Sequence, residues 1–168
     1  MKIMSRSALV ASLLTAATVT FAQPPGGGRP PPPPPSLISY DQAMTAMNAA
    51  EAEARENNWP LTILVVDQNN NPVMMRRMEG ANPFTWNIAQ RKALTVIGSG
   101  MTSREYGEKV QAGEIEEIEN AVTFGGGVPI YLDGQLVGAV TASGARPEED
   151  EAASRAGAEA IGGSIDSP

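Results

Sequence analysis

The stretch GGGVPIYLDGQLVGAVTASGARPEEDEAASRAG, residues 125–157, decides the fold of this chain. Two apolar, β-branched runs at 128–132 and 135–143 flank the pair Asp133-Gly134. That pair tolerates the left-handed backbone angles of a type I′ turn, which joins antiparallel strands through two residues. The stretch therefore predicts a tight β-hairpin that is entered through a glycine turn and followed by a helix.

The two-residue turn also predicts the register of the hairpin. It places Tyr131 opposite Leu136 and Ile130 opposite Val137. Each of these pairs brings two large apolar side chains together on one face of the sheet.

The acids after the hairpin have two interpretations. Pro147 is typical of a first helical position, and we expect the helix to end at Gly162-Gly163. Glu or Asp occupies every position from 148 to 151. Carboxylates in a first helical turn complement the helix dipole and the unpaired amides, and this interpretation accounts for most of them. A metal cluster is the alternative, although the alternating pattern of a calcium loop is absent.

Upstream of the hairpin, the sequence predicts a helix and a first strand pair. Ser39 and Gln42 form a capping box at the start of the helix. Residues 61–66 are nearly all apolar and predict a strand that is buried on both faces. Residues 73–78 predict its partner, across a turn in which Asn70 accepts a positive φ.

Two further helices are expected between the strand pairs. Asn82 caps the first of them, Pro83 takes its first position and Gly98 ends it. A short helix starts at Ser103. The order of elements predicts an α/β (α+β) domain with a largely antiparallel sheet.

The first 36 residues predict export. Residues 1–22 have a basic start, a short apolar run and small residues at the cleavage-flanking positions, which is typical of a secretory signal peptide. An ordinary apolar helix is the alternative. Residues 23–36 are rich in proline and glycine and predict a stiff linker. The domain then covers 37–163, with a tail at 164–168, and we expect a periplasmic or secreted protein without a stable membrane anchor.

Charge and composition exclude several classes of function. The formal net charge is −7, and it becomes −9 once Lys2 and Arg6 leave with the signal peptide. Such a balance disfavours binding to nucleic acid, which depends on Lys and Arg. The chain has no Cys and no His. It therefore lacks disulfides, thiolate nucleophiles, zinc–sulfur sites and imidazole ligands.

The motifs, in this order and spacing, resemble those of the GlcG/HbpS family, which is related to the C-terminal domain of PduO. They are WP at 59–60, VD at 66–67, NPV at 71–73, RMEGA at 77–81, RKA at 91–93, GGVPI at 126–130, DG at 133–134, VGA at 137–139, SG at 143–144, PEEDE at 147–151 and AG at 156–157. The chain departs from the family in having Glu79 where Asp is usual, Asn70 where Gly is usual, and no His.

The resemblance implies a profilin-like fold with a five-stranded, largely antiparallel sheet flanked by helices. It also implies homo-oligomers, from dimers to octamers. Exported members of the family bind heme and are linked to heme handling and redox sensing. Others accompany glycolate or propanediol metabolism without an assigned reaction. The main hypothesis is therefore an exported small-molecule-binding protein, with heme or a similar flat, carboxylated ligand.

The segment that enters the hairpin is the expected ligand site. In related heme binders it contributes to the heme site, so Thr123 is the proposed oxygen ligand to iron. A β-branched residue entering a strand is the alternative interpretation. Gly125, Gly126 and Gly127 could expose amides to a carboxylate or heme propionate. Their other role is to supply the positive φ angles of a tight turn.

Other candidate residues lie elsewhere in the sequence. Met78 and Tyr131 are proposed as apolar ligand wall, although methionines are usually ordinary core. Lys92 is either a carboxylate partner or a side chain whose stem covers apolar surface. Asp150 matches a recurrent family position. Lys92 and Asp150 are also the polar groups of the alternative hypothesis, an enzyme acting on a small organic acid or alcohol-derived metabolite.

Catalysis receives little support from the residues themselves. Ser143-Gly144 lacks the strand–turn–helix context of a nucleophile elbow, and no His is present to activate a hydroxyl. The sequence favours a binding protein over an enzyme.

Overall fold

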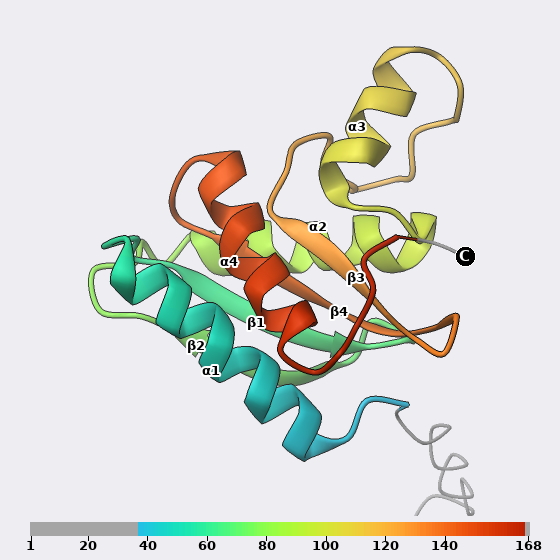
Figure 1. The fold of residues 1–168 in the computed structure, drawn as a ribbon. Helices are drawn as coiled ribbons and strands as arrows, with labels where there is room; N and C mark the ends of the chain where they lie inside the picture. The colour runs from blue at the N-terminus through green and yellow to red at the C-terminus, as the bar shows by residue number, and fades with distance from the viewer. Residues whose placement is uncertain (1–36, 167–168) are drawn as a thin grey trace, which may run out of the picture. The chain divides into compact units, whose positions relative to one another are not determined.

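The computed structural model describes residues 37–166, and Figure 1 shows their arrangement. They form four helices and four strands in the order α1 (Tyr40–Glu56), β1 (Thr62–Asp67), β2 (Pro72–Arg77), α2 (Thr85–Ser99), α3 (Ser103–Gln111), β3 (Gly127–Leu132), β4 (Gln135–Ser143) and α4 (Pro147–Glu159). The predicted signal peptide and the predicted linker lie outside the described residues. The α+β class predicted from the sequence is confirmed.

The strands form one antiparallel sheet in the order β2-β1-β4-β3. Strand β1 is central, and all six of its residues are buried, as the apolar run predicted. Ile63 and Val65 contribute to a core beneath α1 and α4, whereas Leu64 and Val66 contribute to a core beneath α2. Helices α1 and α4 thus cover one face and α2 covers the other, while α3 stands off the sheet beside β3 (Figure 1).

The sequence signals for the start of α1 and for two turns are confirmed. Ser39 Oγ accepts the amide hydrogen of Gln42, and the Gln42 side chain accepts that of Ser39, which is the predicted capping box. Asn70 has a φ of 62° in the turn between β1 and β2. Asp133 and Gly134 have φ angles of 50° and 77°, as a type I′ turn requires.

The structure corrects the expected number of strands and one strand pairing. The described residues contain a four-stranded sheet, not the five-stranded sheet implied by the resemblance. Tyr131 faces Leu136 as predicted, but Ile130 faces Gly138 instead of Val137. The register shifts between Ile130 and Tyr131, which is the effect of an extra residue in one strand.

The boundaries of the second helix were also predicted wrongly. Asn82 accepts the amide hydrogen of Phe84, so it caps a turn, and α2 begins two residues after Pro83, at Thr85. The helix continues past Gly98 and ends at Ser99, and the next residue, Gly100, caps it with a φ of 73°. A glycine ends a helix most readily where the chain takes up a left-handed conformation, and only Gly100 does so here.

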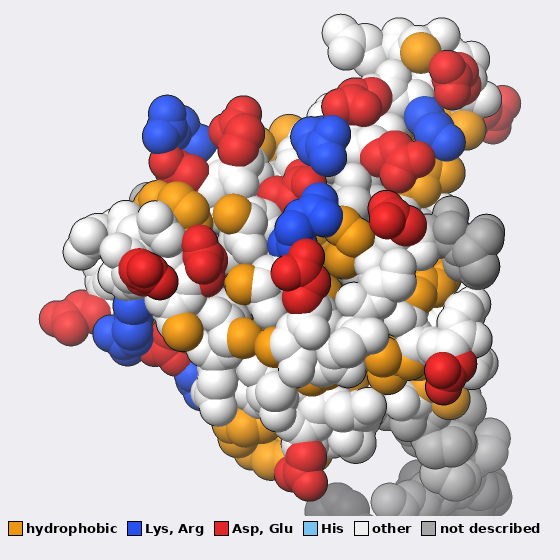
Figure 2. All heavy atoms as spheres, viewed as in Figure 1, with side chains coloured by type: hydrophobic (Ala, Val, Ile, Leu, Met, Phe, Trp, Pro, Cys, Tyr) orange, Lys and Arg blue, Asp and Glu red, His pale blue; other side chains and the backbone are white. Residues whose placement is uncertain are grey.

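The surface carries mixed charge. In Figure 2 the blue basic side chains on the visible face lie beside red acidic ones. Examples from the described residues are the pairs of Arg104 and Arg155 with Glu151. No helix within residues 37–166 has the length and apolar character needed to cross a membrane.

Close packing of α1 against α4 depends on a glycine. A Cβ atom at Gly157 would lie 2.8 Å from the carbonyl oxygen of Ala46 and 3.3 Å from the Cβ of Ala50. The two helix backbones approach this closely because the residues between them are so small. A larger side chain here would push the helices apart.

We expect Gly157→Leu to lower the free energy of unfolding by about 1–3 kcal/mol, the usual cost of overpacking a core. Ala52→Leu is the matched control, because Ala52 is an exposed residue of α1. Its effect should stay within about 0.5 kcal/mol. Urea unfolding followed by circular dichroism measures both, and equal losses in the two variants would contradict this account.

Candidate functional site

The glycine turn before β3 lies close to its neighbours in the fold and is hydrogen-bonded to them. Gly126 has a φ of 120°, so the expected positive φ is present. Its carbonyl oxygen accepts the amide hydrogen of Ala142 at 2.8 Å and the hydroxyl of Ser154 at 2.9 Å. The amide of Gly127 donates to Ser103 Oγ at 3.0 Å. The turn interpretation is thus confirmed for Gly126, whereas Gly125 and Gly127 have no positive φ, and the Gly127 amide is already used within the protein.

Beneath this turn lies a buried ion pair. Lys92 Nζ on α2 donates to Asp150 Oδ2 on α4 at 2.7 Å and to the carbonyl oxygen of Ala142 on β4 at 2.8 Å. The side chains of Lys92 and Asp150 are 0% and 4% exposed. Asp150 Oδ1 accepts the amide hydrogen of Ala145 at 3.0 Å. The two residues that the sequence named as polar site groups are therefore in direct contact.

Burial also shifts the pKa values of Lys92 and Asp150. Loss of water lowers the pKa of Lys92, and the neighbouring Asp150 carboxylate opposes that shift. Burial likewise raises the pKa of Asp150, and the Lys92 ammonium opposes the shift. Each charge is therefore stabilised by its partner and by fixed hydrogen bonds instead of by solvent.

Gly126 and the ring of Phe124 cover the ammonium group of the ion pair. A Cβ atom on Gly126 would lie 2.1 Å from Lys92 Nζ, so glycine lets the ammonium lie directly against the turn. The ring of Phe124 lies over the ammonium, with its centroid 5.4 Å from Nζ. Snorkelling of Lys92 is excluded, because its charged end is buried. In this arrangement the Lys92 ammonium lies against the glycine turn and bonds to Asp150 and Ala142, and its side chain is not exposed to a ligand.

The neighbouring acids of α4 have separate roles. Glu149 accepts the amide hydrogen of Arg146 at 3.0 Å, as expected for the first turn of a helix. Glu151 is buried and accepts hydrogen bonds from Arg104 and Arg155. Capping therefore explains only part of the acidic run, and Asp150 serves the ion pair. Within residues 37–166 no group of three or more acids is arranged to hold a metal ion.

Helix α2 also positions the chain that leads to the turn. Arg91 donates to the carbonyl oxygens of Asn120 and Ala121 at 2.9 and 2.8 Å. Thr95 Oγ1 accepts the amide hydrogen of Val122 at 2.8 Å. These three contacts fix the backbone up to the residue before Thr123.

Thr123 itself lies in a surface groove. A cavity of about 420 Å³ is lined by Gly107, Val110, Gln111, Glu117 and Thr123. Thr123 is exposed, and its carbonyl group is pressed against α3, where a Cβ on Gly107 would lie 2.1 Å from the oxygen. Phe124, next to it, is 40% exposed. The predicted ligand-side residue is thus accessible and held on a rigid support.

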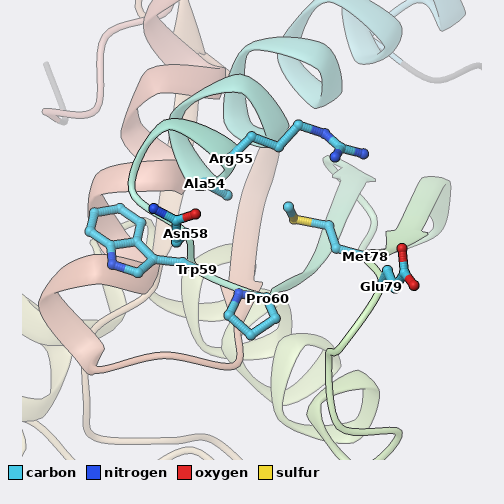
Figure 3. Close-up of a pocket in the computed structure, with 7 residues that line it drawn as sticks. All are labelled: Ala54, Arg55, Asn58, Trp59, Pro60, Met78 and Glu79. Atoms are coloured by element: carbon cyan, nitrogen blue, oxygen red, sulfur yellow. The ribbon is translucent and has the colours of Figure 1, made fainter.

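Two of the predicted wall residues lie apart from this groove. Met78 lines a separate pocket of about 300 Å³ with Trp59 and Pro60, shown in Figure 3. Tyr131 donates its hydroxyl hydrogen to the carbonyl oxygen of Gly100 at 2.9 Å, and burial raises its pKa. Neither residue lines the cavity that contains Thr123.

Sequence reasoning missed the residues that complete the site. Phe124 covers the ammonium, and Ser103 and Ser154 bind the backbone of the glycine turn. A large aromatic residue directly before three glycines was a usable signal for Phe124. The serines carried no such signal, because their partners are distant in sequence.

Comparison with known proteins identifies the family. Residues 38–159 match the family described as haem degrading protein HbpS-like. The chain belongs to the HbpS-like family. This finding confirms the resemblance that the sequence motifs indicated, including its relation to PduO.

Three HbpS-like relatives show the extent of the similarity. GlcG of Escherichia coli K12 is 31% identical over 109 residues, covering 64% of this chain and 81% of GlcG. The crystal structure of PduOC in complex with heme is 25% identical, with a TM-score of 0.71, and covers 76% of this chain and 97% of that one. A double mutant of HbpS from Streptomyces reticuli is 27% identical, with a TM-score of 0.68, and covers 83% and 97% of the two chains.

The ion pair predicts a large penalty when one partner is removed alone. Lys92→Met leaves the Asp150 carboxylate buried without its cation, and we expect the free energy of unfolding to fall by about 3–5 kcal/mol. The double variant with Asp150→Asn should recover part of this loss. Asparagine carries no charge and can still accept the Ala145 amide hydrogen.

Urea unfolding at pH 7 measures these variants. Lys109→Met is the matched control, because Lys109 is a partly exposed lysine that pairs with Glu105 one helical turn away. Its loss should be below about 1 kcal/mol. The account is wrong if Lys92→Met costs no more than this control, or if the double variant is no more stable than Lys92→Met.

Proposed function

We propose that this protein is an exported heme-binding protein, and that heme binds in the groove beside Thr123. The observation that carries the proposal is the position of Thr123. Thr123 is an exposed oxygen donor of a groove of about 420 Å³, and it lies on the segment that leads into the glycine turn. The relative PduOC has been crystallised in complex with heme, which supports the choice of ligand.

The residues of the groove suit a flat ligand with an oxygen-bound iron. The chain has no His or Cys, and the side-chain oxygen donors among the residues lining this cavity are the Thr123 hydroxyl, the Glu117 carboxylate and the Gln111 amide oxygen. Hard oxygen donors favour ferric over ferrous iron. Val110 offers an apolar wall, and Phe124 offers an aromatic face beside the groove. Bound heme would supply a redox-active iron and a visible chromophore.

The support beneath the groove is relevant to binding. The Lys92 ammonium lies behind the Phe124 ring, and Arg91 and Thr95 fix the backbone before Thr123. Groups held in place before binding lose little entropy on binding. The site is therefore largely preformed.

The biological setting follows from the sequence and the family. The signal-like residues 1–22 support export to the periplasm or the outside of the cell. Assembly into dimers or larger rings, up to octamers, and a role in heme handling or redox sensing are proposed from the family resemblance. The residues that carry the enzyme hypothesis, Lys92 and Asp150, are bonded to each other and buried, which supports binding over catalysis.

Hemin titration of the purified protein tests the proposal. We expect a saturable Soret shift at micromolar hemin. Thr123→Ala should weaken the affinity about tenfold and move the Soret maximum, because about 1.4 kcal/mol of an iron–oxygen contact is lost. Thr45→Ala on α1 is the matched control, since Thr45 is an exposed threonine whose hydroxyl bonds only within its own helix.

The Soret shift tests separately whether heme is the ligand and whether Thr123 binds its iron. Absence of any saturable shift in the wild-type protein would rule out heme as the ligand. A normal shift that Thr123→Ala leaves unchanged would remove Thr123 as the iron ligand, and Glu117→Gln would then be expected to abolish the shift instead.

A further inference from the structure

A second groove lies on the outer side of α2. Its volume is about 420 Å³, and it shares no lining residue with the groove of Thr123. Its wall consists of an arginine, four side-chain amides and one leucine, namely Arg91, Asn70, Asn87, Gln90, Asn120 and Leu94. No carboxylate lines it. The lining thus carries a single positive charge, although the chain as a whole has a net charge of −7.

Arg91 presents a preoriented edge to this groove. Its Nε and Nη2 atoms donate to the carbonyl oxygens of Asn120 and Ala121 at 2.9 and 2.8 Å. These bonds occupy one side of the planar guanidinium and fix its orientation. The end edge, formed by Nη1 and the second hydrogen of Nη2, keeps two parallel N–H donors, the geometry that binds a carboxylate through both oxygens.

The charge of Arg91 is also uncompensated. In the described part of the chain, most Lys and Arg side chains form ion pairs with Asp or Glu, and Arg91 does not. Its partners are two neutral carbonyl groups. An arginine held in place without a carboxylate is well prepared to receive one from a ligand.

The amides next to Arg91 complete the recognition. The side chains of Asn87 and Gln90, on the same helix, form no hydrogen bond with other groups of residues 37–166. Each amide offers both donors and an acceptor. A ligand hydroxyl also donates and accepts. It therefore matches a side-chain amide better than a ligand phosphate does, because a phosphate only accepts. Leu94 adds a small apolar surface for a carbon chain.

We propose that this groove binds a small hydroxycarboxylate, with the carboxylate on the end edge of Arg91 and the hydroxyl on Asn87 and Gln90. The groove shares no lining residue with the groove proposed for heme, so the two ligands would not occupy the same space. The groove is also independent of the buried pair of Lys92 and Asp150. A ligand bound at Arg91 would change the environment of Asn120 and Ala121, because Arg91 donates hydrogen bonds to their carbonyl oxygens.

Nuclear magnetic resonance titration of the full-length protein, purified without heme, tests the site. L-Lactate and propionate form the matched ligand pair, because they differ by a single hydroxyl. We expect lactate to shift the Arg91 Nε–H signal and the amides of Asn120 and Ala121, with a dissociation constant on the order of 1 mM for so small a ligand. Propionate should bind at least about fivefold more weakly, as expected when one hydrogen bond of about 1 kcal/mol is lost.

Variants assign the contacts. Arg91→Gln should weaken lactate binding by at least about tenfold, because a charge-assisted pair is lost. The double variant Asn87→Ala, Gln90→Ala removes side chains that hold no other part of the described protein, so its fold should be unchanged. It should bind lactate and propionate equally weakly. Gln135→Ala, an exposed amide at the start of β4, is the control and should bind as the wild type does.

Three results would overturn the proposal. They are the absence of saturable shifts at Arg91, equal affinity of the wild type for lactate and propionate, and unchanged lactate binding in the Asn87 and Gln90 double variant. The last of these decides the matter even if Arg91→Gln fails to fold.

Discussion

The contact between Lys92 and Asp150 is the constraint on which this end of the structure depends. Two opposite charges without access to water join α2 to α4, and the carbonyl oxygen of Ala142 on β4 accepts a second hydrogen bond from Lys92 Nζ. Burying such charges is costly unless each is paired and hydrogen-bonded. The surrounding backbone must therefore adopt the one arrangement that satisfies them, and the glycine turn at Gly126 is the part that makes room.

The ligand segment depends on this arrangement. Residues 120–127 carry little regular structure of their own, yet each part of them is attached to a helix or a strand. Arg91 and Thr95 hold the beginning, Phe124 lies over the ammonium, and Gly126 continues the hydrogen bonding of β4. Residues of this segment line both grooves, Asn120 the one beside Arg91 and Thr123 the other, although the grooves share no lining residue.

Much of the fold could be predicted because the relevant interactions are local. The capping box at Ser39 and the Asp133-Gly134 turn involve residues within three positions of one another, so their sequence signals are sufficient. The errors arose where distant packing overrides local preference. Glycine at position 98 is typical of a helix end, but the helix continues to Ser99 and is capped by Gly100. The hairpin shifts its register between Ile130 and Tyr131.

The sequence by itself determined the element order, the family, and the presence of Lys92, Asp150, Thr123 and three glycines. Only the tertiary structure decided how these residues are used, because the contacts that decide it are distant in sequence, such as the 58 residues between Lys92 and Asp150 and the 24 between Ser103 and Gly127. It turned the lysine and one acid of the 148–151 run into a buried pair and left Thr123 exposed beside Phe124. Burial and distance, which decide whether a charge binds a ligand or supports the fold, are properties of the folded chain.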